Sequence, residues 1–208
     1  MKKYLIEFIG TFFFVSTVGH TVINGGAGVI PPLAIGGMLM VMVFAGGHIS
    51  GGHYNPAVTL AVWLRGKCAT KDVPGYWIAQ VLAAVAAGFL VLFMKGLPTV
   101  NPVPYPGGTV SALIAEFLGT FALAFVVLNV ATAKATAGNS FYGLAIGFTV
   151  VCCAFAFGGY SGGAFNPGIA SGLLTMGLVT ASNFWIYLVG DFLGAAAAAA
   201  VFKITAED

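Results

Sequence analysis

The sequence predicts an all-α integral membrane protein of six spanning helices and two re-entrant half-helices, arranged as an inverted repeat. Three observations support this fold class. The composition is far more apolar than that of soluble domains, because 59% of the 208 residues are hydrophobic and only 7% are charged. Six apolar stretches are about long enough to cross a bilayer. In addition, two sequence motifs occur once in each half of the chain.

The six spans follow from counting apolar stretches, since a spanning helix needs about 20 mostly apolar residues. They are residues 4–24, 33–48, 73–94, 109–133, 139–157 and 181–202. The first stretch follows Lys2 and Lys3, as the core of a cleaved signal peptide would. Its length and the embedded Glu7 favour a retained span instead.

The basic residues predict how the chain is oriented. With a cytoplasmic amino terminus, Lys95 lies near an outer loop and the other seven of the eight basic residues fall on the cytoplasmic side. Those seven are Lys2, Lys3, Arg65, Lys67, Lys71, Lys134 and Lys203. Basic residues concentrate on cytoplasmic loops. We therefore expect both termini in the cytoplasm and the protein in the plasma membrane, or in the inner membrane of a bacterium.

An internal repeat organises the chain. Residues 6–11 (IEFIGT) recur as residues 115–120 (AEFLGT), and residues 50–57 (SGGHYNPA) recur as residues 161–168 (SGGAFNPG). Each half holds three spans, and an odd number of crossings makes the second half enter from the opposite side. We expect one domain over residues 1–208, built of inverted repeats 1–107 and 108–208. An extended outer loop at residues 96–108, containing Pro98, Pro102, Pro104 and Pro106, joins them.

Each Asn-Pro pair follows a glycine-rich loop and precedes an apolar run too short to cross the membrane. Pro56 and Pro167 suit the first helical position, and Asn55 and Asn166 suit the cap before it. We expect two half-helices whose amino ends meet near the membrane midplane. There the asparagine amides can donate hydrogen bonds to a neutral solute, and the partial positive charge of the two helix ends repels cations. Two ordinary helix caps are the alternative, which the matching repeats disfavour. The predicted half-helices are residues 56–64 and 167–176.

Residues 47–59 (GHISGGHYNPAVT) resemble the first signature loop of the aquaporin (major intrinsic protein) family, and residues 161–167 are similar to the second. The resemblance covers essentially the whole chain. It implies a channel for water and small neutral solutes that forms a homotetramer with one pore per subunit. The implied pore motifs are Asn55-Pro56-Ala57 and Asn166-Pro167-Gly168, and the implied loop-bracing residues are Glu7, Glu116, His48 and Gln80.

The second motif departs from the family, because Gly168 and Ile169 stand where most members have alanine and arginine. By the family pattern, the outer constriction is lined by Ile35, Ala154, Gly163 and Ile169. The single arginine, Arg65, lies in a cytoplasmic loop, so we expect this constriction to be apolar and wide. Glycerol, urea, ammonia, hydrogen peroxide or a neutral weak acid then become candidate solutes. An isoleucine-lined neck can also slow or gate water by dewetting.

Three polar residues have open roles. Asp191 is the repeat equivalent of Gln80, where the family more often has proline. It is either a structural aspartate in the tetramer or the loop-bracing network, or a group with a solute- or pH-linked role. His20 faces the outer half of the pore or packs between spans, and we expect His53 to support the first Asn-Pro loop.

Three other classes compete with a passive channel. A weakly conducting structural protein of the same fold is favoured only by the apolar constriction. A proton-coupled transporter also has inverted repeats and broken helices, but Glu7, Glu116 and Asp191 are explained more simply as bracing groups. An enzyme is disfavoured because no nucleophile–base pair, metal set or phosphate loop is found. We expect no metal, no cofactor and no nucleic-acid partner.

Overall fold

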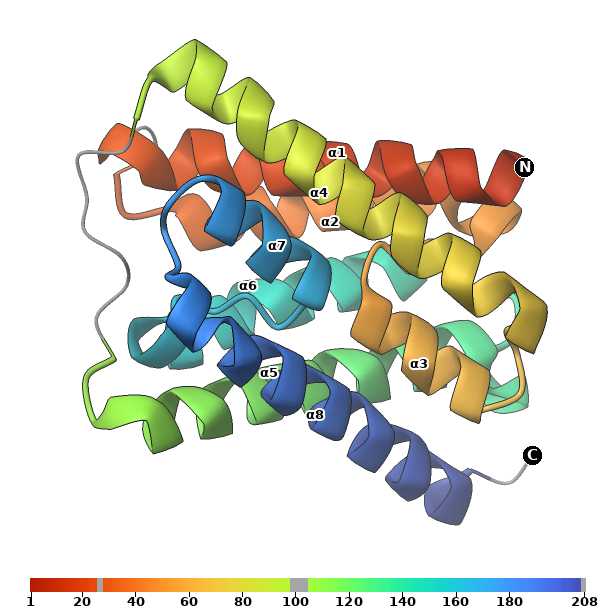
Figure 1. The fold of residues 1–208 in the computed structure, drawn as a ribbon. Helices are drawn as coiled ribbons and strands as arrows, with labels where there is room; N and C mark the ends of the chain where they lie inside the picture. Colours follow the sequence, from red (N-terminus) through yellow and green to blue (C-terminus); the bar gives the residue numbers. More distant parts are fainter. Residues whose placement is uncertain (26–27, 98–104, 207–208) are drawn as a thin grey trace.

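The computed structural model describes residues 1–25, 28–97 and 105–206, and within these ranges the regular structure is helical (Figure 1). Two nine-residue helices, α3 (Pro56–Leu64) and α7 (Pro167–Thr175), are too short to cross a bilayer. Six helices are long and apolar enough to do so: α1 (Lys2–Val22), α2 (Pro31–Ser50), α4 (Val73–Lys95), α5 (Gly108–Thr132), α6 (Tyr142–Ser161) and α8 (Phe184–Thr205). The predicted fold class of six spans and two half-helices is confirmed.

The helix bounds differ from the predicted ones by a few residues. The fifth span begins at Tyr142 and not at Asn139, because the Asn139 amide donates to the carbonyls of Val130 (2.7 Å) and Thr136 (2.6 Å) in the preceding turn. The second half-helix ends at Thr175, one residue early. Of the prolines predicted in the outer loop, Pro106 is described, whereas Pro98, Pro102 and Pro104 lie outside the described residues.

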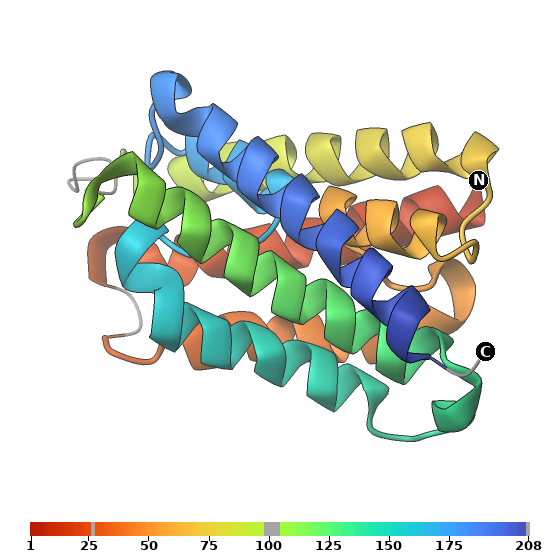
Figure 2. The ribbon, with the colours of Figure 1, turned by 90° about the horizontal axis from the view of Figure 1, so that it is seen from below.

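The helices pack as two equivalent sets. In the first half α1 contacts α2 and α4, in the second half α5 contacts α6 and α8, and α2 lies against α6 between the halves. Both termini lie at one end of the bundle in both views, here called the terminal end (Figures 1 and 2). Helix α3 occupies the terminal end, and α7 occupies the opposite end, here called the far end (Figure 1).

Two glycines allow α2 and α6 to approach closely. A Cβ atom added to Gly36 would lie 2.4 Å from the carbonyl oxygen of Gly147, and one added to Gly147 would lie 2.5 Å from that of Gly36. Small residues at helix crossings are typical of membrane bundles, where close van der Waals contact drives association. The two halves are therefore joined backbone to backbone at this crossing.

Each glycine-rich loop contains an aromatic ring that packs against the first helix of its half. Tyr54 and Phe165, which directly precede the two asparagines, both have a φ of 48° and are almost fully buried. A Cβ added to Gly10 of α1 would lie 2.1 Å from the Tyr54 ring, and one added to Gly119 of α5 would lie 2.1 Å from the Phe165 ring. The first helix of each half thus leaves space for the loop of the same half.

Charged side chains secure the two ends of the bundle. At the terminal end Lys3 pairs with Asp72, which also accepts a hydrogen bond from the Tyr4 hydroxyl at 2.9 Å. At the far end Lys95 donates to the carbonyls of His20 (2.9 Å) and Ile23 (2.5 Å). A cation there satisfies otherwise unpaired carbonyls at the carboxyl end of α1.

Candidate functional site

The two asparagines cap the half-helices in the same way. Asn55 Oδ1 accepts from the backbone N–H groups of Ala57 (2.8 Å) and Val58 (3.3 Å). Asn166 Oδ1 accepts from those of Gly168 (2.8 Å) and Ile169 (3.3 Å). Glycine at position 168 therefore leaves the second cap unchanged. Each cap fixes the direction of its side-chain amide at the amino end of a half-helix.

The same side chains also join the two halves of the protein. Asn55 Nδ2 donates to the carbonyl of Phe165, and Asn166 Nδ2 donates to the carbonyl of Tyr54, both at 2.9 Å. A side-chain amide has two N–H donors. The second N–H of each amide has no partner among the described residues, and both side chains line the same small cavity. Each asparagine can therefore offer one donor to a passing oxygen atom.

Glu7 accepts four hydrogen bonds, three from residues at the first loop and one from α4. Its Oε1 accepts from the Ser50 hydroxyl (2.7 Å) and the His53 N–H (2.9 Å). Its Oε2 accepts from the Tyr54 N–H (2.6 Å) and from Gln80 Nε2 (2.8 Å). Glu7 is fully buried, so these four donors replace the water that the carboxyl group loses.

Glu116 holds the second loop in the same manner but with three donors. Its Oε1 accepts from the Ser161 hydroxyl (2.5 Å) and the Ala164 N–H (3.0 Å), and its Oε2 accepts from the Phe165 N–H (2.6 Å). The carboxyl group of Asp191 lies beside it, where Gln80 stands in the first half. Both carboxyl groups are fully buried.

The two histidines expected to support the first loop lie in different environments. His48 is exposed and makes no hydrogen bond to the described residues, so the prediction that it braces the loop is wrong. The buried histidine is His53, whose Nδ1 lies 3.1 Å from the Thr59 hydroxyl. Its ring packs against Tyr76 with 4.9 Å between the ring centroids. His48 projects outward because it lies in the last turn of α2, before the chain turns inward at Gly51.

His20 lies beside α4 and away from the cavities described below. Its Nδ1 is 2.8 Å from the Ser16 carbonyl, and its own carbonyl accepts from Lys95. It lines none of the four cavities described below. Of its two predicted positions, the geometry matches packing between spans.

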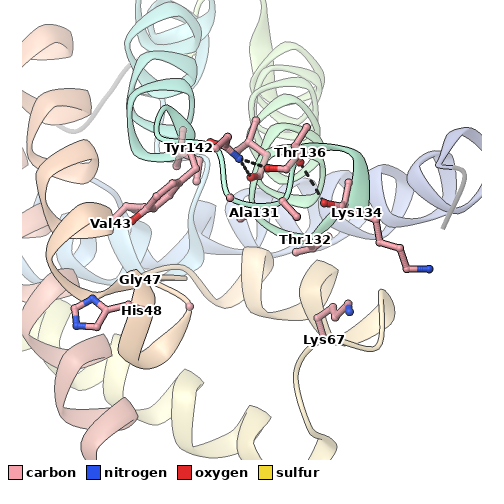
Figure 3. Close-up of a pocket in the computed structure, with 16 residues that line it drawn as sticks. Val43, Gly47, His48, Lys67, Ala131, Thr132, Lys134, Thr136 and Tyr142 are labelled. Carbon is pink, nitrogen blue, oxygen red and sulfur yellow. Dashed lines mark hydrogen bonds between the residues drawn. The ribbon is translucent and has the colours of Figure 1, made fainter.

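Two cavities open at the terminal end of the bundle. The larger has a volume of about 550 Å³ and the other about 450 Å³, and Gly51, Lys67, Ala131 and Thr132 line both. Figure 3 shows the larger one, with His48 at its edge and Lys67 and Lys134 on the opposite side. His53 lines the smaller cavity, which therefore leads towards the first Asn-Pro motif.

The centre of the protein is much narrower. A cavity of about 10 Å³ lies between Asn55 and Asn166, which is roughly the volume that one water molecule needs. We call this constriction the waist. Its apolar walls come mainly from Phe14, Leu39, Val58, Leu123, Val127 and Ile146. The sequence reasoning missed the waist, although Phe14 and Leu123 are repeat equivalents at the offset of the IEFIGT motif.

The far end holds a cavity of about 220 Å³, here called the outer cavity. The structure brings the four predicted constriction residues, Ile35, Ala154, Gly163 and Ile169, together in its lining. The remaining lining residues are apolar side chains, glycines and prolines. No charged or aromatic side chain lines this cavity in the described part of the chain. Arg65 lies at the other end, after α3, with its guanidinium 5.0 Å from the Phe202 ring.

Two tyrosines that support the loops were also not predicted from the sequence. Tyr76 donates to the Ser50 carbonyl (2.5 Å), and Tyr187 donates to the Ser161 carbonyl (2.6 Å). Each hydroxyl satisfies the end of the helix that leads into a loop, so each tyrosine is part of the loop's support. Their equivalent positions in the two repeats could have identified them, because Tyr76 and Tyr187 stand four residues before Gln80 and Asp191 respectively.

Comparisons with known proteins agree with this geometry. A sequence profile described as Major intrinsic protein matches residues 1–202. The chain is 39% identical to Aquaporin NIP1-1 of Oryza sativa subsp. japonica over 98% of its own length and 74% of that protein. It is 34% identical to Probable aquaporin TIP2-2 of the same organism, over 98% of its own length and 86% of that protein.

Among solved structures, the aquaglyceroporin from Plasmodium falciparum matches with a TM-score of 0.84. The match covers 98% of this chain and 96% of that one at 23% identity, so it supports the shared fold. The chain belongs to the major intrinsic protein family and is a passive membrane channel for water and small solutes, not an enzyme.

Proposed function

We propose that this channel passes water together with small uncharged solutes, such as ammonia, hydrogen peroxide, urea and glycerol, through an outer constriction that does not discriminate by polarity. The observation that carries the proposal is the outer cavity, because the described residues that line it provide no fixed charge and no aromatic ring to narrow it. The motifs Asn55-Pro56-Ala57 and Asn166-Pro167-Gly168 form the centre of the pore. There the free amide donors replace part of the hydration of a solute.

Ions are excluded at the same centre. The amino ends of α3 and α7 meet there, and each carries partial positive charge that opposes a cation. The waist leaves space for about one water molecule. An ion therefore loses its hydration shell without gaining charged partners, whereas a neutral solute loses far less.

The waist also supports a second candidate function. Apolar walls around a space of about 10 Å³ favour dewetting, so a weakly conducting or gated channel of the same fold is the alternative. The experiment that separates the two is stopped-flow light scattering on proteoliposomes with water, ammonia, urea and glycerol. Rapid uptake of the neutral solutes supports the first function, and fluxes equal to those of empty liposomes support the second.

We expect Phe14→Leu to widen the waist. The substitution gives this position the side chain of its repeat equivalent Leu123, with a smaller volume at the narrowest point. Urea and glycerol uptake should rise at least about threefold, with water flux nearly unchanged. Stopped-flow uptake measures this. Phe13→Leu on the exposed side of α1 is the matched control, and equal uptake in both variants would place size selection elsewhere.

The proposal includes topology and assembly. The single channel domain spans repeats 1–107 and 108–208, with both termini in the cytoplasm and the chain in the plasma or inner membrane. Seven of the eight basic residues belong to the amino terminus, the α3–α4 and α5–α6 connections and the end of α8, which supports this orientation. A homotetramer with one pore per subunit is the assembly that family membership supports.

Labelling of Cys68 tests the orientation. Cys68 lies in the α3–α4 connection and lines the smaller terminal-end cavity. In a background of Cys152→Ser and Cys153→Ser, a membrane-impermeant maleimide should label inverted vesicles and not intact cells. Burial raises the pKa of the Cys68 thiol, and the thiolate is the reactive form, so labelling should accelerate as the pH rises through the alkaline range. Labelling of intact cells would reverse the proposed topology.

A further inference from the structure

The two halves of the protein support their loops with different chemistry at one position. In the first half, the fourth donor to the carboxyl group of Glu7 is the amide of Gln80, at 2.8 Å. In the second half, the corresponding position is held by Asp191, whose carboxyl group lies beside that of Glu116. A carboxyl group can donate a hydrogen bond only while it carries a proton.

Among the described residues, the donors near Asp191 are the Thr120 hydroxyl and the backbone N–H of Asn166, and no side chain supplies a further donor on the side that faces Glu116. Asp191 is fully buried, and its Oδ1 accepts from the Thr120 hydroxyl at 2.8 Å. Its Oδ2 is also buried and has no hydrogen-bond partner among the described residues. In the first half, the equivalent space contains the hydroxyl of Thr59 and the ring of His53. Their repeat equivalents, Ala170 and Ala164, have no polar side-chain atom.

Among the described residues, no cation balances the two carboxyl groups. From α5 the titratable neighbour of Asp191 is Glu116, and from α8 it is Tyr187, whose hydroxyl is directed to the Ser161 carbonyl. The half-helices α3 and α7, which also pack on α8, contain no acidic, basic, histidine, cysteine or tyrosine residue. Two adjacent ionised carboxyl groups in such surroundings repel each other strongly, and one of them therefore stays protonated.

We propose that Glu116 and Asp191 form a proton-binding site that holds one shared proton, so that Asp191 donates to Glu116 as Gln80 donates to Glu7. The proton fixes the loop that carries Gly163 and Asn166, because Glu116 accepts from the two N–H groups directly before Asn166. The site does not depend on which solute passes through the pore.

The site gives the second loop a dependence on pH that the first loop lacks. While the proton is bound, the pair carries one negative charge and all its close contacts are favourable. When the proton leaves as the pH rises, two buried negative charges face each other and the loop loses its support. In the unfolded chain both carboxyl groups ionise at ordinary acidic pH. The stability that the proton provides is therefore fully present at acidic pH, and it is lost progressively as the pH rises until the folded protein releases the proton.

Infrared difference spectroscopy of the purified protein tests for the proton directly. At neutral pH the parent should show the C=O stretch of one buried protonated carboxylic acid, sensitive to exchange into D2O. Asp191→Asn should abolish that band, and Asp72→Asn, which removes an acidic group at the surface, should leave it unchanged. The absence of the band in the parent, or its persistence in Asp191→Asn, would overturn the proposal.

Thermal stability against pH provides the second test. Asn has the shape of protonated Asp, with an oxygen for Thr120 and a permanent N–H donor for Glu116. Parent protein should lose several degrees of melting temperature between neutral and strongly alkaline pH, whereas Asp191→Asn should change by less than half as much. Failure of Asp191→Asn to fold, or an equal loss in both proteins, would contradict a shared proton. Gln80→Glu, which creates the same pair in the first half, should add a second acid band.

Discussion

Ile169→Arg should reduce urea and glycerol uptake at least about tenfold while water flux stays within about twofold of the parent. Ile169 is the third residue of α7 and is directed into the outer cavity, where a longer side chain has open space to enter. A guanidinium group there narrows the passage and adds a fixed positive charge. Larger neutral solutes lose the space they need, whereas single water molecules still pass.

The measurement is stopped-flow light scattering on proteoliposomes with equal protein content. Ile169→Met is the matched control, because it lengthens the side chain without adding charge or hydrogen-bond donors. Its urea and glycerol uptake should stay within about threefold of the parent. If Ile169→Arg transports glycerol as well as Ile169→Met does, Ile169 does not line the narrowest part of the outer path.

Glu7→Gln should destabilise the protein by about 3 kcal/mol, although the two side chains have almost the same shape. In either orientation the amide nitrogen of Gln would face a backbone N–H group, that of His53 or that of Tyr54. At least one buried N–H then has no acceptor, and the hydrogen bonds that remain lose the charge of the carboxylate. Without its anchor, the loop cannot hold Asn55 at the centre of the pore.

Thermal melting in detergent, followed by water flux in proteoliposomes, measures both effects. Tyr4→Phe is the control on the same helix, since it removes one hydrogen bond to Asp72 near the terminal end. It should cost less than about 1 kcal/mol and leave the flux unchanged. A melting temperature for Glu7→Gln equal to that of the control would show that the four contacts of Glu7 contribute little.

Much of the fold could be predicted because the physical signals are strong and local. Apolar length gives the six spans, and the repeated IEFIGT and SGGHYNPA patterns give the inversion. The half-helix starts at Pro56 and Pro167 were predicted to the residue, since proline and a preceding asparagine together define a helix start. Helix ends were less certain, because a polar residue such as Asn139 can bond to the preceding turn instead of continuing a helix.

The side-chain environment was harder to predict. Counts from the two asparagines by the family pattern identified Ile35, Ala154, Gly163 and Ile169, which share one cavity. They gave no rule for choosing between His48 and His53, because the direction of each ring depends on where the chain turns inward at Gly51. The waist at Phe14 also remained hidden, since a buried phenylalanine on an apolar helix has the same sequence signal whether it faces a pore or a neighbouring helix.

The reciprocal hydrogen bonds between the asparagines and the opposite loops have a consequence for biosynthesis. They join residues 110 and 112 positions apart, from Asn55 to Phe165 and from Tyr54 to Asn166. Until the ribosome has added the second half, the carbonyl of Tyr54 and the amide of Asn55 lack these partners. Unpaired polar groups in hydrocarbon cost several kcal/mol each. We therefore expect the first half-helix to reach its final depth only after translation has passed the second Asn-Pro pair, which makes completion of the pore a late step in folding.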